Sequence, residues 1–239
     1  MLWTMTMLQR PFTRDDLEVL RQWDTPTICN GLELIVPERR AIGFTVEPMV
    51  ALHPDPAKAP IVGLARTGTI RAREAPRGPV ADRLDWYDYV AEADLQTIVV
   101  IQDLDDRPGY GAFWGEVHTN VHMRLGAEGC ITNGSFRDLA ASAKGFQIFG
   151  GRVGPSHAHV HLTGFGGPVN VFGMQAVHDD VIHADIHGAV VVPAECVKKL
   201  PAAIDLVSRR EKVILDLCAA PGFTAAKLRG AMKASQEIH

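Results

Sequence analysis

Three charged side chains are spaced along the middle of the chain in a way that could assemble a site for a metal ion and a carboxylate. Glu116 follows a glycine-rich segment at residues 109–115, and Arg137 and Asp138 come after a further twenty residues. Glycines let backbone N–H groups approach a ligand, and a glycine-rich loop that begins a helix is suited to binding an anion. Two carboxylates without a histidine or cysteine partner suit a hard cation that keeps several waters, Mg²⁺ or Mn²⁺. An arginine beside them can bind a substrate carboxylate through two hydrogen bonds.

A loop, a helix and a strand must bring these residues together. After Glu116, apolar residues recur at roughly helical spacing over residues 117–125, and a glycine suited to a helix end follows. Residues 129–132 predict a short buried strand, and Asn133-Gly134 predicts a turn. An excursion of this length can return beside its start, which would set both carboxylates and the arginine around one cleft. A surface salt bridge next to a hairpin explains the same residues equally well.

This segment resembles the signature of the family of 4-hydroxy-4-methyl-2-oxoglutarate aldolases and regulator-of-ribonuclease-activity-A-like proteins. That signature is an acidic residue, twenty residues and then Arg-Asp, which Glu116, Arg137 and Asp138 satisfy. The neighbouring residues are similar to the family's Gly-x-Val-x-Asp-Gly-x-x-Arg-Asp, with Asn133 where Asp is usual. A later segment, up to Pro193, resembles the family's second signature, Gly-Asp-x-x-x-Ala-Asp-x-x-Gly-Val-Val-Val-x-Pro, with His178-Asp179 or Asp179-Asp180 in place of its Gly-Asp.

The resemblance covers about residues 20–225 and implies an α/β fold, a single-domain β/β/α swivelling-domain-like sandwich. It also implies a homotrimer or a hexamer with sites near subunit boundaries. On this basis we expect one aldolase-like domain over residues 1–239, with helical arms at the N-terminus (residues 1–35) and at the C-terminus (residues 194–239). Periodicity alone supports only a mixed α/β domain.

The activity that the resemblance implies is that of a class II pyruvate aldolase, a carbon–carbon lyase that depends on a divalent metal. Such an enzyme cleaves a 4-hydroxy-2-oxo acid to pyruvate and a second carbonyl compound, and oxaloacetate decarboxylase activity is expected with it. Asp138 would bind Mg²⁺ or Mn²⁺ directly, and Glu116 would bind it through water. Arg137 would act on the substrate, and His118 is the first candidate for the catalytic base. The expected substrate-binding residues are Gly115, Glu116, Val117, His118 and Arg137.

Other functions compete with the aldolase. A non-catalytic regulator that binds a ribonuclease would need a surface patch and no complete metal set, and the fold could also carry an unrelated reaction of a sugar acid or oxo acid. A Schiff-base aldolase needs a desolvated lysine of lowered pKa, whereas the lysines here fall in predicted loops or polar helical stretches. A methyltransferase is rejected because the chain has no G-x-G-x-x-G loop.

Two further segments could bear on function. His157, His159 and His161 alternate, so on a strand they would share one face and could bind zinc or copper. Two or three such ligands on one strand rarely complete a closed metal site, which argues against this interpretation. Residues 72–80 form a charged, proline-bearing loop, which is either simply solvated or a positive rim that attracts a polyanionic substrate.

Composition narrows the class of protein. A hydrophobic content of 46% with 22% charged residues is that of a soluble globular protein, and the net charge of −4 argues against a nucleic-acid partner. No apolar run reaches the roughly 18 residues of a membrane helix, and the first residues lack the features of a signal peptide. The four cysteines are scattered, as free thiols of a cytosolic protein are. We therefore expect a cytoplasmic protein that contacts neither nucleic acid nor membrane.

The remaining elements are predicted from periodicity and caps. Thr13 and Asp16 resemble a capping box, and Thr25-Pro26 resembles a second helix start with Thr25 as the cap. Strands are predicted at residues 44–52, 61–71, 96–102, 146–149 and 169–177, and helices at residues 82–93 and 139–144 and from 194 onwards with a break at Pro221-Gly222. The run at 96–102 is continuously apolar, which predicts burial on both faces.

Overall fold

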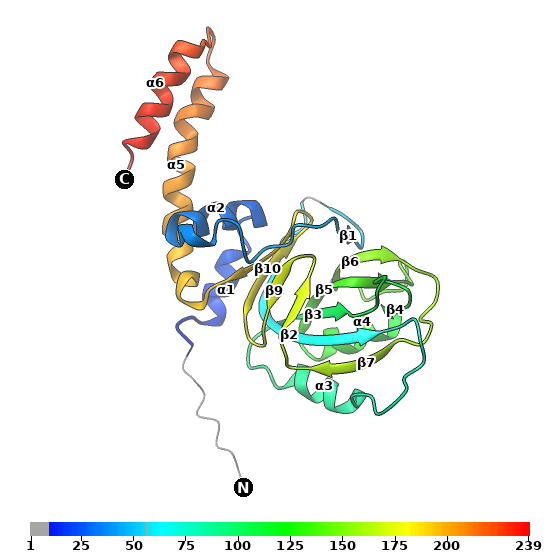
Figure 1. The fold of residues 1–239 in the computed structure, drawn as a ribbon. Coiled ribbons are helices and arrows are strands. Elements are labelled where there is room, and N and C mark those ends of the chain that lie inside the picture. The colour runs from blue at the N-terminus through cyan, green and yellow to red at the C-terminus, as the bar shows by residue number, and fades with distance from the viewer. Residues whose placement is uncertain (1–9, 56) are drawn as a thin grey trace.

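A curled, mixed β-sheet forms the body of the molecule in the computed structural model, which describes residues 10–55 and 57–239 (Figure 1). The strand order is β1-β6-β5-β3-β2-β10-β11, with β4 paired to β5 and β7 paired to β2. The pairs among β2, β3, β5 and β6 are parallel, as is the pair of β4 with β5. The strands are β1 (Val50–Ala51), β2 (Ile61–Arg71), β3 (Thr97–Asp103), β4 (Ala112–Trp114), β5 (Ala127–Phe136), β6 (Gln147–Val153), β7 (His161–Phe165), β10 (Val181–Asp185) and β11 (Gly188–Val192), and a separate hairpin holds β8 (Val169–Val171) and β9 (Met174–Ala176).

Helices lie on the outside of this sheet (Figure 1). The capping box predicted at Thr13 and Asp16 is confirmed. The predicted cap of the second helix is wrong, because Thr25 is already helical. The cap is Asp24, whose side chain accepts a hydrogen bond from the Thr27 N–H group. The helices are α1 (Arg14–Leu20), α2 (Thr25–Ile35), α3 (Arg83–Ala91), α4 (Glu116–Arg124), α5 (Leu200–Ala219) and α6 (Ala225–Gln236), with short 3₁₀ helices at Pro37–Arg39 and Ala194–Lys199. Among the described residues, none of the helices combines the length and apolar character needed to cross a membrane.

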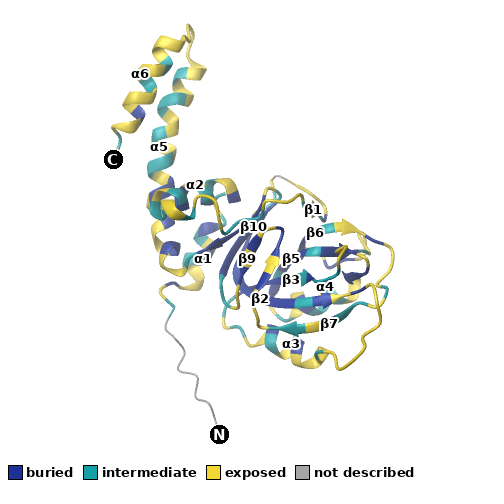
Figure 2. Ribbon diagram, in the orientation of Figure 1, coloured by how far each residue is buried: buried dark blue, intermediate teal, exposed yellow. Residues whose placement is uncertain are grey.

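The core has a layer on each face of the sheet, and β3 contributes to both. Val99 and Ile101 pack with the aromatic residues of α3 and β4, while Ile98 and Val100 pack toward the β8–β9 hairpin. All four side chains are fully buried, which confirms that this run is covered on both faces. The aromatic side chains of the core lie between the sheet and helices α3 and α4. Figure 2 shows the buried residues of the sheet in dark blue.

A third apolar cluster joins α1, α2 and the start of α5 to β10 and β11. Gly31 is the point of closest approach, because a Cβ atom there would lie 2.8 Å from Leu200 Cδ2 and 2.9 Å from Ile204 Cγ1. Beyond this contact α5 leads away from the sheet, and α6 folds back along it after the predicted break at Pro221-Gly222 (Figure 1). Most of this helical hairpin is exposed (Figure 2).

Several predicted elements differ in the structure. The strand expected at residues 44–52 is reduced to β1, and the one expected at 169–177 is the β8–β9 hairpin. The helix expected at 139–144 is a single turn in which the N–H groups of Ala141 and Ser142 both donate to the Asp138 carbonyl. The turn expected at Asn133-Gly134 is absent, because β5 continues through these residues to Phe136. The absence of a signal peptide was predicted from residues 1–9, which lie outside the described residues.

The continuation of β5 through Asn133-Gly134 has a local cause. The Asn133 side chain accepts a hydrogen bond from the Asp103 N–H group (2.7 Å) and donates one to the Asp103 carbonyl (3.1 Å). These bonds bind β5 to the end of β3, beyond the last regular pair of the two strands, Ile101 with Thr132. The strand therefore passes the turn-forming dipeptide and ends only at Phe136, directly before the Arg-Asp pair.

Candidate active site

The register between β4 and β5 brings the two halves of the candidate site together. Trp114 pairs with Phe136, and the Arg137 N–H group donates to the Trp114 carbonyl over 3.0 Å. The next residue of each strand, Gly115 and Arg137, therefore leaves the sheet at the same edge. Helix α4 begins immediately afterwards at Glu116. The twenty-residue interval thus spans one helix and one strand and returns beside its start.

Asp138 and Arg137 meet over the surface of Gly115. The Asp138 Oδ2 atom accepts a hydrogen bond from the Glu116 N–H group (3.2 Å) and lies 3.5 Å from the Arg137 Nε atom. A Cβ atom on Gly115 would lie only 2.5 Å from this oxygen and 3.3 Å from Arg137 Cγ. The backbone of Gly115 is extended, with φ −168°, so glycine is required by the approach of two side chains and not by the backbone conformation.

The predicted site residues line one cavity of about 590 Å³ at the carboxyl ends of β4 and β5. This position is where ligands bind in open α/β sheets. The side chains of Arg137 and Asp138 are 36% and 37% exposed, so both remain accessible. The lining includes Pro76, Arg83, Ala112, Phe113, Gly115, Glu116, Val117, His118, Arg137, Asp138, His157, Ala158, His159, Val160 and His161.

His118 lies half-buried in the wall of this cavity. Its ring meets Phe113 edge-on, with 4.3 Å between ring centroids, and its Nδ1 atom is buried without a hydrogen-bond partner among the described residues. Burial, followed by the positive charges of Arg83 and Arg137, lowers its pKa to about 4. His118 is therefore neutral at neutral pH.

Helix α4 is held in place by polar side chains, although an apolar face was expected. Val117 and Met123 are 67% and 43% exposed, whereas Thr119 and His122 are fully buried. The His122 ring accepts a hydrogen bond from Trp86 Nε1 (2.8 Å) and its Nδ1 atom lies 2.7 Å from the His118 carbonyl. The Thr119 hydroxyl donates to the Glu116 carbonyl over 2.9 Å. These contacts fix the turn of helix that carries the candidate catalytic residues.

The interpretation of the glycine-rich segment needs correction. Gly109 has a φ of +85°, and its N–H group donates to the Asp103 carboxylate over 2.7 Å. Gly111 packs against the His157 backbone, so a side chain there would collide with that strand connection. Only Gly115 of the three glycines reaches the cavity. The other two shape the turn that leads into β4.

The three alternating histidines do not share a strand face, contrary to the prediction. Only His161 belongs to β7, and Ala158 between the others has a φ of +47°. The Nδ1 atoms of His157 and His161 lie 2.8 and 2.7 Å from the carbonyls of Ala158 and His159. Within residues 10–55 and 57–239, no group of three or more His, Cys, Asp or Glu side chains is arranged to hold a metal ion.

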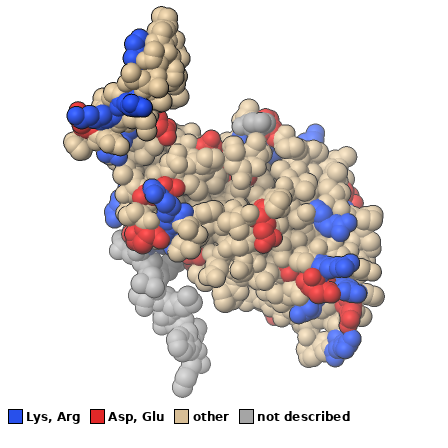
Figure 3. All heavy atoms as spheres, turned by 45° about the horizontal axis from the view of Figure 1, so that its top comes forward, with Lys and Arg blue, Asp and Glu red and all other residues tan. Residues whose placement is uncertain are grey.

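Two features of the cavity bear on its charge. Arg83, the first residue of α3, lines the cavity opposite the predicted residues and was missed because no motif marks it. The loop at residues 72–80 is not an unpaired positive rim, since Arg73 pairs with Asp106 (2.9 Å) and Arg77 with Glu74 (2.5 Å). On the face shown in Figure 3, basic and acidic side chains lie next to one another.

The curled mixed sheet with helices on its outside and a cavity at the carboxyl ends of β4 and β5 defines a mixed α/β protein. A sequence model of the RraA-like family, described as Aldolase/RraA, matches residues 25–191, and the chain belongs to this family. The resemblance noted from the sequence is therefore confirmed. The family includes aldolases and inhibitors of ribonuclease E.

Solved structures support the same fold. An uncharacterized protein from Pseudomonas syringae pv. tomato str. DC3000 matches with a TM-score of 0.69 at 19% identity, covering 94% of this chain and 95% of the other. RraAS2 of Streptomyces coelicolor, described as an unusual member of the RNase ES inhibitor RraA protein family, matches with a TM-score of 0.65 at 21% identity, over 81% and 93% of the two chains. A structure described under novel cellulases from gut-associated microbes matches with a TM-score of 0.68 at 20% identity, over 84% and 88%. Comparison with curated proteins gives no match.

Proposed function

We propose that the protein is a divalent-metal-dependent pyruvate aldolase that cleaves a 4-hydroxy-2-oxo acid to pyruvate and a second carbonyl compound. Oxaloacetate decarboxylation is expected at the same site, because it too passes through the enolate of pyruvate. The observation that supports this proposal is the position of the Asp138 carboxylate, which lies beside Arg137 and against the bare backbone of Gly115. Glu116, the first residue of α4, lines the same cavity as Asp138, so both carboxylates are available to one ligand.

The residues present fit a hard cation. Asp138 Oδ2 is held by the Glu116 N–H group, and Oδ1 accepts no hydrogen bond from the described residues. Two carboxylates without a third protein ligand suit Mg²⁺ or Mn²⁺, which retain several waters, and do not suit a closed zinc site. Asp138 would hold the ion directly and Glu116 through water. A bound divalent cation would supply stabilisation of the negative charge that develops on the keto oxygen during C–C cleavage.

The protein's own groups orient the substrate. The Arg137 guanidinium makes one contact among the described residues, with Asp138, and its remaining N–H groups can bind the substrate carboxylate in a planar, two-point geometry. Gly115 brings no side chain to cap α4, so the N–H groups of Val117 and His118 are available to an anion. Both contacts favour a carboxylate placed next to the carbonyl that reacts.

His118 is our candidate for proton transfer to and from the 4-hydroxyl group. A neutral imidazole can accept this proton, but a base of pKa about 4 is weak at neutral pH. Part of the lowering of the His118 pKa comes from the positive charges of Arg83 and Arg137. An anionic substrate bound between these two arginines would offset that contribution and make His118 more basic when it is needed.

The experiment that tests this function measures pyruvate release from a panel of 4-hydroxy-2-oxo acids and oxaloacetate. We expect release with Mg²⁺ or Mn²⁺, loss of release in excess EDTA, and recovery when the metal is restored. Asp205 lies near the start of α5, is exposed and does not line the cavity, so Asp205→Ala is a matched control for substitution of Asp138. Full activity in excess EDTA would refute the metal-dependent mechanism. Failure of every substrate would favour a non-catalytic regulator of a ribonuclease instead, which a ribonuclease inhibition assay would detect.

A further inference from the structure

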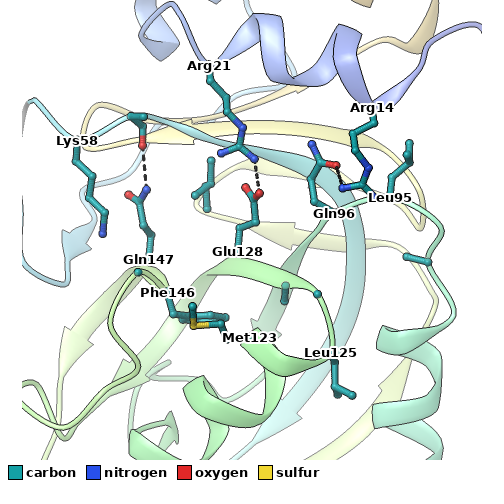
Figure 4. Close-up of a pocket in the computed structure, with 16 residues that line it drawn as sticks. Arg14, Arg21, Lys58, Leu95, Gln96, Met123, Leu125, Glu128, Phe146 and Gln147 are labelled. Carbon is teal, nitrogen blue, oxygen red and sulfur yellow. Dashed lines mark hydrogen bonds and ion pairs between the residues drawn. The ribbon is translucent and has the colours of Figure 1, made fainter.

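A second cavity, of about 630 Å³, lies at the opposite edge of the sheet from the candidate active site. It opens at the amino ends of the parallel strands β2, β3, β5 and β6, where Ile61, Gln96, Ala127 and Gln147 line it. Arg14 and Arg21 reach into it from α1 (Figure 4). Its volume lies within the range of about 300–1,000 Å³ found for small-molecule pockets.

One cationic side chain of this cavity is already neutralised. Arg21 forms ion pairs with Glu128 and with Glu18, and it donates to the Pro60 carbonyl over 3.1 Å. These contacts tie α1 to the first residues of β2 and β5. Arg21 is therefore paired with two carboxylates and serves the fold.

Two other cationic side chains are not neutralised. Arg14 donates to neutral acceptors, the Gln96 Oε1 atom (3.0 Å) and the Asp94 carbonyl (3.1 Å). The Lys58 ammonium group makes neither an ion pair nor a hydrogen bond with the described residues; burial lowers its pKa, and the negative charge of Asp55 offsets part of this lowering. Figure 4 shows Lys58 extended beside Gln147, whose amide donates to the Ala59 carbonyl over 2.9 Å. Neither Arg14 nor Lys58 has an ion-pair partner among the described residues, so both cationic groups are available to an anion.

The side of the cavity away from α1 is apolar. Phe146 and Met123 lie together there, with Leu125 further along the same side (Figure 4). Met123 is 43% exposed, so its thioether lies at the cavity surface and is free to pack on a ligand. An inorganic anion would use only the cationic side. A carboxylate with a hydrocarbon or aromatic body would use both.

We propose that this cavity is a second ligand site for a small organic carboxylate, with its charge at Lys58 and its apolar body on Phe146 and Met123. The site is separate from the candidate active site, because the two cavities share no lining residue and lie at opposite ends of the parallel strands. The proposal does not depend on the aldolase function. It concerns binding by the chain as it stands.

The test uses 3-phenylpropionate as the probe, titrated calorimetrically into the full-length protein. The neutral 3-phenylpropanamide has nearly the same shape and should bind at least about tenfold more weakly, because it lacks the charge that Lys58 recognises. Inorganic phosphate should compete with the probe only weakly, because it uses the cationic side alone. Lys58→Gln should weaken probe binding about tenfold or more, whereas Lys233→Gln, on the exposed surface of α6, should leave it unchanged.

A second pair of variants separates this cavity from the candidate active site. Met123→Ser should weaken probe binding without loss of fold, since the side chain is partly exposed, and circular dichroism checks the fold. Asp138→Ala should bind the probe as the parent does. The proposal is overturned if the probe does not bind the parent protein, if Lys58→Gln binds it normally, or if Asp138→Ala abolishes its binding.

Discussion

Substitution of Gly115 by alanine tests the candidate site with a single added methyl group. The backbone there is extended and accepts any residue, so the change does not strain the chain. The new Cβ atom would lie 2.5 Å from Asp138 Oδ2, about 1 Å closer than an ordinary contact allows. Because the Asp138 carboxylate is at the end of a short, accessible side chain, we expect it to rotate away while the fold is retained.

The expected cost follows from the contact that is lost. Rotation of the carboxylate breaks its hydrogen bond with the Glu116 N–H group, and hydrogen bonds to charged groups contribute about 1.5–3 kcal/mol. We therefore expect the affinity for Mn²⁺ or Mg²⁺ to fall by a factor of roughly 10–100. Calorimetric titration of the metal and lactate-dehydrogenase-coupled pyruvate release measure the two consequences. At saturating metal, part of the activity should return.

Gly167→Ala is the matched control, because a Cβ atom there meets nothing within 4 Å. It should leave both metal affinity and pyruvate release unchanged. Thermal unfolding should show that Gly115→Ala is folded and within about 1 kcal/mol of the parent, since the added methyl group meets only movable side chains. A folded Gly115→Ala variant with parental metal affinity would show that Asp138 is not a metal ligand.

Four further predictions concern the site, stability and assembly. Arg137→Lys should remain folded yet lose about 2–4 kcal/mol of transition-state stabilisation, because lysine cannot reproduce the planar two-point contact of arginine. The loss should appear in both kcat and KM. Turnover equal to that of the parent would show that the substrate carboxylate binds elsewhere. Asp138→Ala should abolish metal binding measured by titration. Glu116→Gln should only weaken it, because an amide can still hold a metal-bound water. Equal losses in the two variants would contradict these different roles. Burial lowers the pKa of His122 to about 3 and those of His118 and His183 to about 4, so all three are neutral in the folded state and protonate first in the unfolded state. The free energy of unfolding should therefore fall by about 5 kcal/mol from pH 6.5 to pH 5, and urea unfolding that is flat over this range would refute it. Light scattering at micromolar concentration should show a trimer or hexamer, and a monomer would contradict the expected assembly.

The parts of the fold that could be predicted are those set by local sequence. The β-branched run of β3 signals a strand covered on both faces, and the capping box at Thr13 signals the start of α1. The spacing from Glu116 to Arg137 correctly brought the candidate residues together, since one helix and one strand of ordinary length return the chain to the same edge. Their roles in catalysis stay predictions.

The parts that could not be predicted depend on contacts between distant segments. Asn133 is part of a turn signal, yet its side chain bonds to Asp103 on another strand, and this keeps β5 extended. His122 is buried because its ring accepts a hydrogen bond from Trp86 on α3 and packs against Trp114 on β4, and both partners are distant in the sequence. Arg83 reaches the cavity because α3 packs near α4, which no local pattern indicates. Long-range hydrogen bonds of this kind override local propensity.

The return path from Glu116 to Arg137 also constrains how the length of the chain can change. A residue added within α4 would turn everything after it by about 100° around the helix axis, and a residue added within β5 would exchange the inner and outer faces of the strand. Either change would separate Asp138 from the Glu116 N–H group. The turn at residues 104–108 and the loop at residues 72–80 lie outside this path and can absorb insertions without that effect. The interval therefore acts as a fixed-length connector, and insertions should be tolerated in these two segments instead.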